Sequence, residues 1–157
     1  MVLNHRAVLL MMANRTDDAV TLLDQADAAA AGDGFNADAS IRFTRGRLMM
    51  KNGNNAAAMS HFQHALELDR QAGFTRGMAD DLSAMSAIYE QLGEDEAALD
   101  CLDRSIKIYA LLENQAKVLE NLGRLESLAL KTGTDVRVTV HFINQWLAGE
   151  AVDAICR

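Results

Sequence analysis

The chain has 157 residues, a net charge of −7, a hydrophobic fraction of 50% and only 5% aromatic residues. This length fits one domain with enough interior to fold alone. The acidity excludes a nucleic-acid binder, which needs a basic face, and argues against a basic membrane-surface helix. Proline is absent and the apolar residues are mostly Ala, Leu and Met, so the composition predicts an all-α protein.

The first predicted element is a helix at the N-terminus. The longest apolar run, Ala7 to Ala13, is too short to span a bilayer, so we expect no membrane insertion. Because His5 and Arg6 precede it, this run is compatible with the core of a signal peptide, but it lacks a small-residue cleavage site. We interpret it as the first helix of a repeat. A reducing cytoplasm is the default compartment, with the periplasm as the alternative.

The turns along the chain recur at a fixed period. Four aligned segments place a glycine or asparagine at the same point, with spacings of 39, 40 and 40 residues: Asn14, Gly53, Gly93 and Gly133. Both residue types adopt the left-handed conformation that ends a helix. A short polar or acidic residue then lies in or near the first turn of the next helix, at Asp17, Asn54, Glu94 and Asp135. We therefore expect a single domain over 1–157 with repeats at about 1–34, 35–74, 75–113 and 114–150.

The second helix of each predicted pair has a small residue where the two helices should touch. These residues are Ala19, Ala58 and Ala98, followed by Val138. One turn later a large apolar residue follows, at Leu23, Phe62, Leu102 and Phe142. This pattern predicts a close crossing of the two helices in every pair.

These residues resemble the tetratricopeptide repeat. The resemblance rests on Gly46, Met49, Gly53, Ala58, Phe62 and Ala65 in the second repeat, and on Tyr89, Gly93, Ala98 and Leu102 in the third, where Ser105 replaces the usual alanine. The family's tryptophan is replaced by Leu3, Arg42, Leu82 and Leu122, and its closing proline is missing. The period is similar to that of the longer-helix subgroup seen in kinesin light chains and several bacterial regulators. The resemblance implies a right-handed all-α solenoid of about four antiparallel helix pairs.

The fourth repeat has two competing patterns. Residues 135–142 alternate with period two, which is typical of a strand. Val136, Val140, Ile143 and Leu147 also fall on one helical face. The register of the other repeats favours a helix, although its β-branched residues make it a poor one.

No residue pattern predicts a catalytic, cofactor or metal site. His61 and His64 share a helical face, but no further ligand completes a metal site. His61, Cys101 and His141 take equivalent places in successive repeats, and we interpret them as a polar column. Cys101 has no basic neighbour that would make a thiolate, and Cys101 and Cys156 form no redox spacing. The glycines fall singly, without a phosphate loop. We expect neither cofactor nor enzyme activity.

The first helices of stacked pairs line an inner groove in such solenoids, and partners bind there. In the family's register the groove-facing residues are Asn4, Val8, Met11, Met12, Phe43, Arg47, Met50, Lys51, Ser83, Ala87, Glu90 and Gln91, with Glu120, Ser127 and Lys131 beyond. The lysine and asparagine clamp of chaperone-binding members is absent. Methionine suits an adaptable surface for apolar or amphipathic segments. The resemblance therefore implies a protein- or peptide-binding adaptor or scaffold.

The end of the chain suggests a second hypothesis. The last helix contains the apolar residues Val140, Phe142, Ile143, Trp146 and Leu147, and residues 150–157 are too few for a full capping helix. Either this end pairs with a second copy in a homodimer, or the sequence was cut from a longer protein. A third hypothesis is a peptide-sensing regulatory domain of a larger protein.

Overall fold

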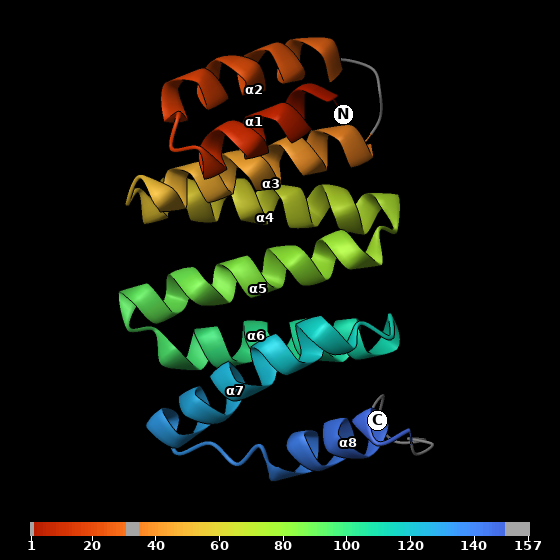
Figure 1. The fold of residues 1–157 in the computed structure, drawn as a ribbon. Coiled ribbons are helices and arrows are strands. Elements are labelled where there is room, and N and C mark those ends of the chain that lie inside the picture. The colour runs from red at the N-terminus through yellow and green to blue at the C-terminus, as the bar shows by residue number, and fades with distance from the viewer. Residues whose placement is uncertain (1, 31–34, 150–157) are drawn as a thin grey trace.

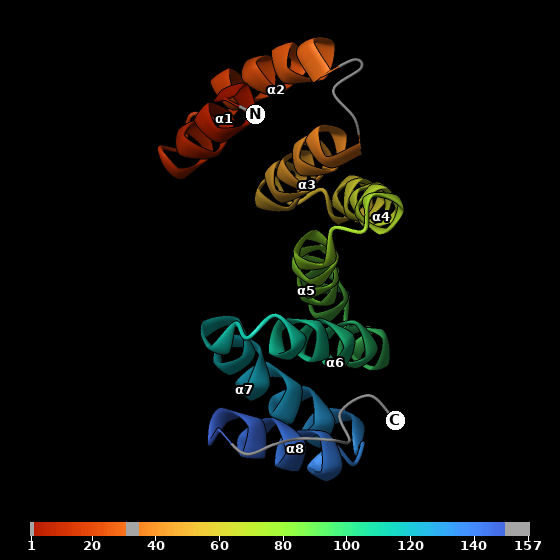
Figure 2. The same cartoon turned by 90° about the vertical axis from the view of Figure 1, so that its right-hand side faces the viewer.

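The structure is a computed structural model that describes residues 2–30 and 35–149. Within these ranges the chain forms eight helices and no strand. They are α1 (Val2–Met12), α2 (Thr16–Ala30), α3 (Phe35–Lys51), α4 (Asn55–Ala72), α5 (Thr75–Leu92), α6 (Asp95–Leu111), α7 (Gln115–Thr132) and α8 (Arg137–Leu147). Figures 1 and 2 show the helices stacked from α1 and α2 at one end to α8 at the other. The chain is an all-α solenoid, as its composition and period predict. The predicted end of the last repeat and Cys156 lie outside the described residues.

The four predicted turn residues do end the first helix of each pair. Their φ angles are positive, at 61° for Asn14, 76° for Gly53, 76° for Gly93 and 71° for Gly133. This left-handed backbone lets the chain reverse within a few residues, and it is the conformation that Gly and Asn adopt most readily. The recurrence of these residues therefore corresponds to a real structural period.

Two asparagines start the helices that follow turns. Asn54 accepts a hydrogen bond from the backbone N–H of Ala57 through its Oδ1 atom, at 3.1 Å. Asn114 accepts from Lys117 in the same way, at 3.2 Å. Each side chain satisfies one of the N–H groups that the first turn of a helix leaves without a partner.

Helices α3 and α4 approach each other closely at Gly46. A Cβ atom on Gly46 would lie 2.7 Å from the nearest ring atom of Phe62, so only glycine fits there. The positions one repeat away from Gly46 are Ala7 and Ser86, and both are fully buried. The large partners on the second helices, Leu23 and Leu102, are fully buried too. Small residues on the first helix thus let the second helix approach.

The hydrophobic core continues along the whole stack. One cluster joins α1, α2 and α3, a second joins α3 to α6, and a third joins α5 to α8. Some partly buried residues belong to two clusters, including Met49 and Tyr89. Each pair therefore covers the apolar face of its neighbour, as expected for a solenoid.

Residues 137–147 form helix α8, so the strand-like alternation over residues 135–142 does not produce a strand. Asp135 lies just before this helix, where its Oδ1 atom accepts from the backbone N–H of Arg137 at 3.0 Å. The helical pattern prevails because it places three apolar side chains against the core: Ile143 is fully buried, and Val140 and Leu147 are partly buried.

The predicted close crossing is wrong for the fourth pair. Close backbone contact joins α1 to α2, α3 to α4 and α5 to α6, but is nearly absent between α7 and α8. Val138, predicted as the small contact residue, is 68% exposed. Phe142, predicted as its large partner, is only half-buried, and Ile143 is buried instead.

A change of residue size explains this departure. The α7 residue one repeat beyond Gly46 and Ser86 is Glu126, which is exposed. A long charged side chain at this position keeps α8 from approaching α7, because burying its carboxylate without a partner is costly. Val138, which is β-branched, also replaces the alanine on the second helix. Helix α8 therefore reaches the core through large side chains rather than by close backbone approach.

The α3–α4 crossing can be tested with a matched pair of glycine substitutions. We expect Gly46→Ala to lower the free energy of unfolding by about 1–3 kcal/mol, because the new methyl group meets the Phe62 ring. Gly123 lies within α7 and a Cβ there would meet nothing within 4 Å. Gly123→Ala should therefore raise the free energy of unfolding by about 0.5–1 kcal/mol. Urea unfolding measures both, and equal effects would contradict the close crossing.

Candidate functional site

The first helices of the pairs lie side by side along the stack. Helices α1 and α3 are in contact, as are α3 and α5. Hydrogen bonds continue the row to α7, since the Oγ atom of Ser83 donates to Oδ1 of Asn121 at 3.2 Å. Two hollows open between the exposed sides of these four helices.

The first hollow is a cavity of about 460 Å³ shared by the last turns of α1, α3 and α5. We call it the methionine cavity, and its lining residues are Met11, Met12, Arg47, Met50, Lys51 and Gln91. All six residues belong to the groove set predicted from the sequence, and they come from three different repeats. Met11 is buried, Met50 is half-buried and Met12 is 77% exposed. The methionine part of the wall is therefore apolar and made of flexible side chains.

Two cations lie at the methionine cavity. Most arginines and lysines in the described part of the chain are ion-paired, but neither Arg47 nor Lys51 forms an ion pair with any described residue. The Nζ atom of Lys51 donates to the backbone carbonyl of Met11 at 2.5 Å, near the C-terminal end of α1. A cation there suits the negative end of the helix dipole. Arg47 is exposed and its charge is not neutralised.

The second hollow, which we call the polar cavity, has a volume of about 350 Å³ between α5, α6 and α7. Its charges are neutralised internally. Arg124 forms an ion pair with Glu90, and its Nη1 atom donates to Oδ1 of Asn121 at 3.0 Å. Lys131 forms an ion pair with Asp95 at 2.7 Å. This network links α5 and α6 to α7 and leaves little unsatisfied charge for a ligand.

The remaining predicted groove residues take structural roles or are half-buried. Asn4 is buried, and its Nδ2 atom donates to the Ser40 hydroxyl at 2.8 Å, which ties α1 to α3. The ring of Phe43 packs against Phe62, with centroids 5.4 Å apart. Val8 and Ala87 are half-buried. Ser83 and Glu90 belong to the hydrogen-bond network that reaches α7.

The sequence analysis missed Arg124, which holds the polar cavity together. Its Nε atom donates to Oε1 of Glu90 at 3.1 Å, and its Nη2 atom donates to the hydroxyl of Ser86 at 3.3 Å. A usable signal existed, because Arg124 and Glu90 are opposite charges on first helices one repeat apart. The register alone did not show that the two side chains point toward each other.

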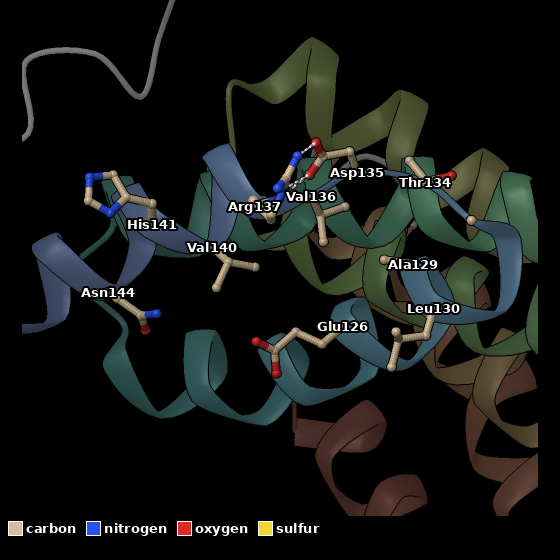
Figure 3. A pocket seen from close by; sticks show the side chains of 11 residues that line it. Glu126, Ala129, Leu130, Thr134, Asp135, Val136, Arg137, Val140, His141 and Asn144 are labelled. Atoms are coloured by element: carbon tan, nitrogen blue, oxygen red, sulfur yellow. Dashed lines mark hydrogen bonds and ion pairs between the residues drawn. The ribbon is translucent and has the colours of Figure 1, made fainter.

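A third hollow lies between α7 and α8, where the close crossing is lost. It is a cavity of about 820 Å³, and we call it the terminal cavity. Figure 3 shows Glu126 and Leu130 from α7 on one side and Val140, His141 and Asn144 from α8 on the other. Leu130 is 85% exposed. The connecting turn is fixed by an ion pair between Asp135 and Arg137 at 2.7 Å.

The residues predicted for self-association mostly contribute to the chain's own core. Ile143 is fully buried, and Val140, Trp146 and Leu147 are partly buried against the third core cluster. Phe142 is half-buried and its ring lies 5.7 Å from that of His141. The exposed apolar surface of this repeat lies instead on Leu119, Leu130 and Val138.

The histidines and the cysteine of the predicted column differ in environment. Cys101 is buried, His61 is half-buried and His141 is exposed, so the three do not form a uniform polar column. Burial, together with the charges of Arg42 and Arg45, lowers the pKa of His61. Burial, together with the charge of Asp100, raises the pKa of the Cys101 thiol. Within the described ranges no group of three or more His, Cys, Asp or Glu is placed to hold a metal ion.

Comparison with known proteins gives one match. The family model for the tetratricopeptide repeat matches residues 36–111, which span α3 to α6. No curated protein and no solved structure matches the chain. Among the described residues, no helix is both long enough and apolar enough to cross a membrane.

The environment of Cys101 predicts a thiol that reacts slowly. In a Cys156→Ser variant, which leaves one thiol, we expect labelling by a chromogenic disulfide reagent at pH 8 to be at least about tenfold slower than in the urea-unfolded chain, because burial blocks access and disfavours the thiolate. Stopped-flow absorbance measures the two labelling rates and gives this ratio. Rapid labelling of the folded protein would instead indicate an accessible nucleophile in α6.

Proposed function

Because the chain belongs to the tetratricopeptide-repeat family, we propose that it is a protein- or peptide-binding adaptor or scaffold whose ligand lies along the first helices of the pairs. Repeats of this family generally mediate protein–protein interaction and are typically not catalytic. The observation that favours this site is the methionine cavity, where three repeats meet and two of them contribute methionines beside two cations that form no ion pair with a described residue. We propose no enzyme activity, cofactor or nucleic-acid partner.

The cavity's composition defines the kind of segment that fits. Met11, Met12 and Met50 offer apolar, adaptable walls that suit a large apolar side chain. The positive charge of Arg47 favours a neighbouring acidic residue on the ligand. In a protein of net charge −7, a local excess of positive charge also steers an acidic segment toward this site during association. The ligand we propose is therefore an amphipathic segment with an acidic residue beside an apolar one.

The polar cavity contributes less to this binding. Its arginine and lysine are already paired with Glu90 and Asp95, so a charged ligand would have to displace these partners. The row of first helices is thus asymmetric, with unpaired charge near α1 and α3 and paired charge near α5 and α7. This asymmetry supports one orientation of the bound segment.

The ligand chemistry can be tested by selection from a library of random peptides. We expect the wild type to enrich sequences that combine an acidic residue with a large apolar one. Arg47→Glu should remove the preference for acidic residues and lower the affinity for the peptides selected by the wild type by about tenfold or more, which corresponds to about 1.4 kcal/mol. Met12→Glu should reduce the apolar preference, since this side chain is exposed at the cavity. Fluorescence anisotropy measures the affinities.

A matched control is Arg76→Glu, which reverses another cation that forms no ion pair with a described residue but lies at the start of α5, away from the cavity lining. It should bind like the wild type. Phe43 is unsuitable for this test because its ring packs on Phe62 and its loss would disturb the core. If Arg47→Glu, Met12→Glu and the control all select the same peptides as the wild type, the methionine cavity is not the binding site.

Exposed leucines favour self-association as a second candidate function. Leu119 and Leu130 on α7 are 59% and 85% exposed, and Val138 on α8 is similarly open. In a homodimer, the terminal repeat of a second copy would cover these side chains and the terminal cavity. The alternative of a sensor domain in a larger protein would use the same surface to contact its effector.

Leu130→Glu tests the dimer by sedimentation velocity at high protein concentration. We expect a dimeric wild type and a monomeric Leu130→Glu variant, because a charge at the centre of an apolar interface lacks a partner. Leu9→Glu changes a leucine of α1 that is 52% exposed, and this control should remain dimeric. A wild type that sediments as a monomer at every concentration rules out the homodimer.

A further inference from the structure

Two buried carboxyl groups lie in the junction between the second and third helix pairs. Asp69 lies in the last turns of α4 and Asp81 lies on α5, and both are buried, with Asp81 0% exposed. The Asp69 carboxyl packs onto Gly77 so closely that a Cβ atom on this glycine would overlap Asp69 Oδ2. Helices α4 and α5 are in close contact along this junction.

As carboxylates, these two groups have too few hydrogen-bond donors. Among the described residues, Oδ1 of Asp69 and both carboxyl oxygens of Asp81 lack a partner. Asp81 lies four residues after Gly77, on the side of α5 that the Asp69 carboxyl packs against, so a proton on Asp81 would supply the missing donor between the two groups. Two buried carboxyl groups that cannot both ionise cheaply share a proton for the same reason in other proteins.

The charges that act most strongly on the pair are acidic. Asp80 lies beside it on α5, and on α6 the hydroxyl of Tyr109 donates to Oδ1 of Asp80 at 2.5 Å. Burial and the bond to Asp80 raise the pKa of the Tyr109 hydroxyl, and the charge of Glu120 on α7 raises it further. None of the ion pairs among the described residues involves Asp69, Asp80 or Asp81. Burial, followed by the charge of Asp80, raises the pKa of Asp69 to about 6; burial, followed by the charges of Asp69 and Asp80, raises that of Asp81 to about 9.

We propose that the proton shared by Asp69 and Asp81 is a pH-sensitive latch that holds the second helix pair against the third. With the proton in place the two carboxyl groups bond to each other across the α4–α5 junction. Without it, two negative charges lie in a buried space where no described residue forms an ion pair with either of them. The junction then opens, because separation of α4 and α5 is the simplest way to let water reach both groups.

The direction of the pH effect follows from the raised pKa of each group. A carboxyl that binds its proton more tightly in the folded chain stabilises the fold most below the unfolded pKa, and this stabilisation is lost as the pH rises through the folded pKa. Between about pH 6 and pH 9 the folded pair retains one proton that the unfolded chain has released. The folding equilibrium constant should therefore fall by up to about tenfold per pH unit in this window.

The latch also bears on the row of first helices. The junction sets how α5 lies against α3, and these two helices share the methionine cavity. Any effect of pH on a bound segment rests on the proposed function, so the decisive experiment uses the protein alone. Its result does not depend on whether the methionine cavity binds a ligand.

The experiment compares the full chain with Asp81→Asn and Asp69→Asn, each of which removes one ionisable group and keeps the shape. Urea unfolding from pH 5 to pH 9.5 should show the wild type losing stability relative to Asp81→Asn, by up to about tenfold in the equilibrium constant per pH unit above pH 6. Asp69→Asn removes the like charge, so its profile should also be flatter than that of the wild type. Asp100→Asn, an exposed change of equal charge on α6, should parallel the wild type.

A local readout separates an opening junction from general instability. Amide hydrogen exchange of residues 69–82, corrected for the intrinsic effect of pH, should accelerate about tenfold or more between pH 6 and pH 9 in the wild type and much less in the Asn variants. Parallel stability profiles for the wild type and every variant that folds would overturn the proposal. Unchanged protection of residues 69–82 while other helices lose protection would also overturn it, because the effect would then lie elsewhere.

Discussion

The contact between Gly46 and the ring of Phe62 represents the constraint on which the rest of this structure depends. Two helices that cross at this distance leave no room for a side chain on the first helix, so the residue there must be small. Ala7 and Ser86 keep the same condition in the first and third pairs. The second helices then lie close behind the first ones, which brings α1, α3 and α5 into a continuous row. The first three pairs all have a small residue at the crossing, so their helices pack in the same way and α1, α3 and α5 line up. The methionine cavity forms where the last turns of these three helices meet.

The fourth pair shows what happens when this condition is not met. Glu126 places a charged side chain at the crossing, and α8 packs through Ile143 at a greater distance. The space that a close crossing would have filled becomes the terminal cavity, and Leu130 beside it stays exposed. One residue of the wrong size thus changes both the packing of the last helix and the surface that this end presents. Both proposed binding surfaces therefore depend on the residue size at the helix crossing. The methionine cavity forms where this residue is small, and the terminal cavity forms where it is large.

The sequence predicted those features that depend on local backbone chemistry and on period. Asn14, Gly53, Gly93 and Gly133 marked the turns because their conformational freedom is a property of the residue itself. The convergence of Met12, Lys51 and Gln91 followed from register, since a fixed period places equivalent residues on one face. The failures concern particular side chains. Val138 has the right place in the register, yet the size of Glu126 on another helix decides whether α8 approaches. Asn4 and Phe43 also lie on the expected helices, but Ser40 and Phe62 bond or pack with them inside the stack. Such pairings depend on where two side chains meet in space, and a period does not contain that information.

The distribution of charge links the surface to the core in this acidic chain. Most cations of the described residues pair with nearby acids, and some of these pairs join helices, as Arg45 with Asp27 between α2 and α3 and Arg124 with Glu90 between α5 and α7 illustrate. Within the described ranges no cation pairs with the buried carboxyl groups between α4 and α5, where we propose that a proton balances the charge instead. Arg47 at the methionine cavity likewise forms no ion pair with a described residue. An unpaired cation at the surface costs little, because water solvates it until an acidic ligand arrives, whereas an unpaired carboxylate in the junction has no water to solvate it. The two imbalances therefore have different consequences: the exposed one is suited to recognition, and the buried one makes the packing of the central repeats depend on a proton.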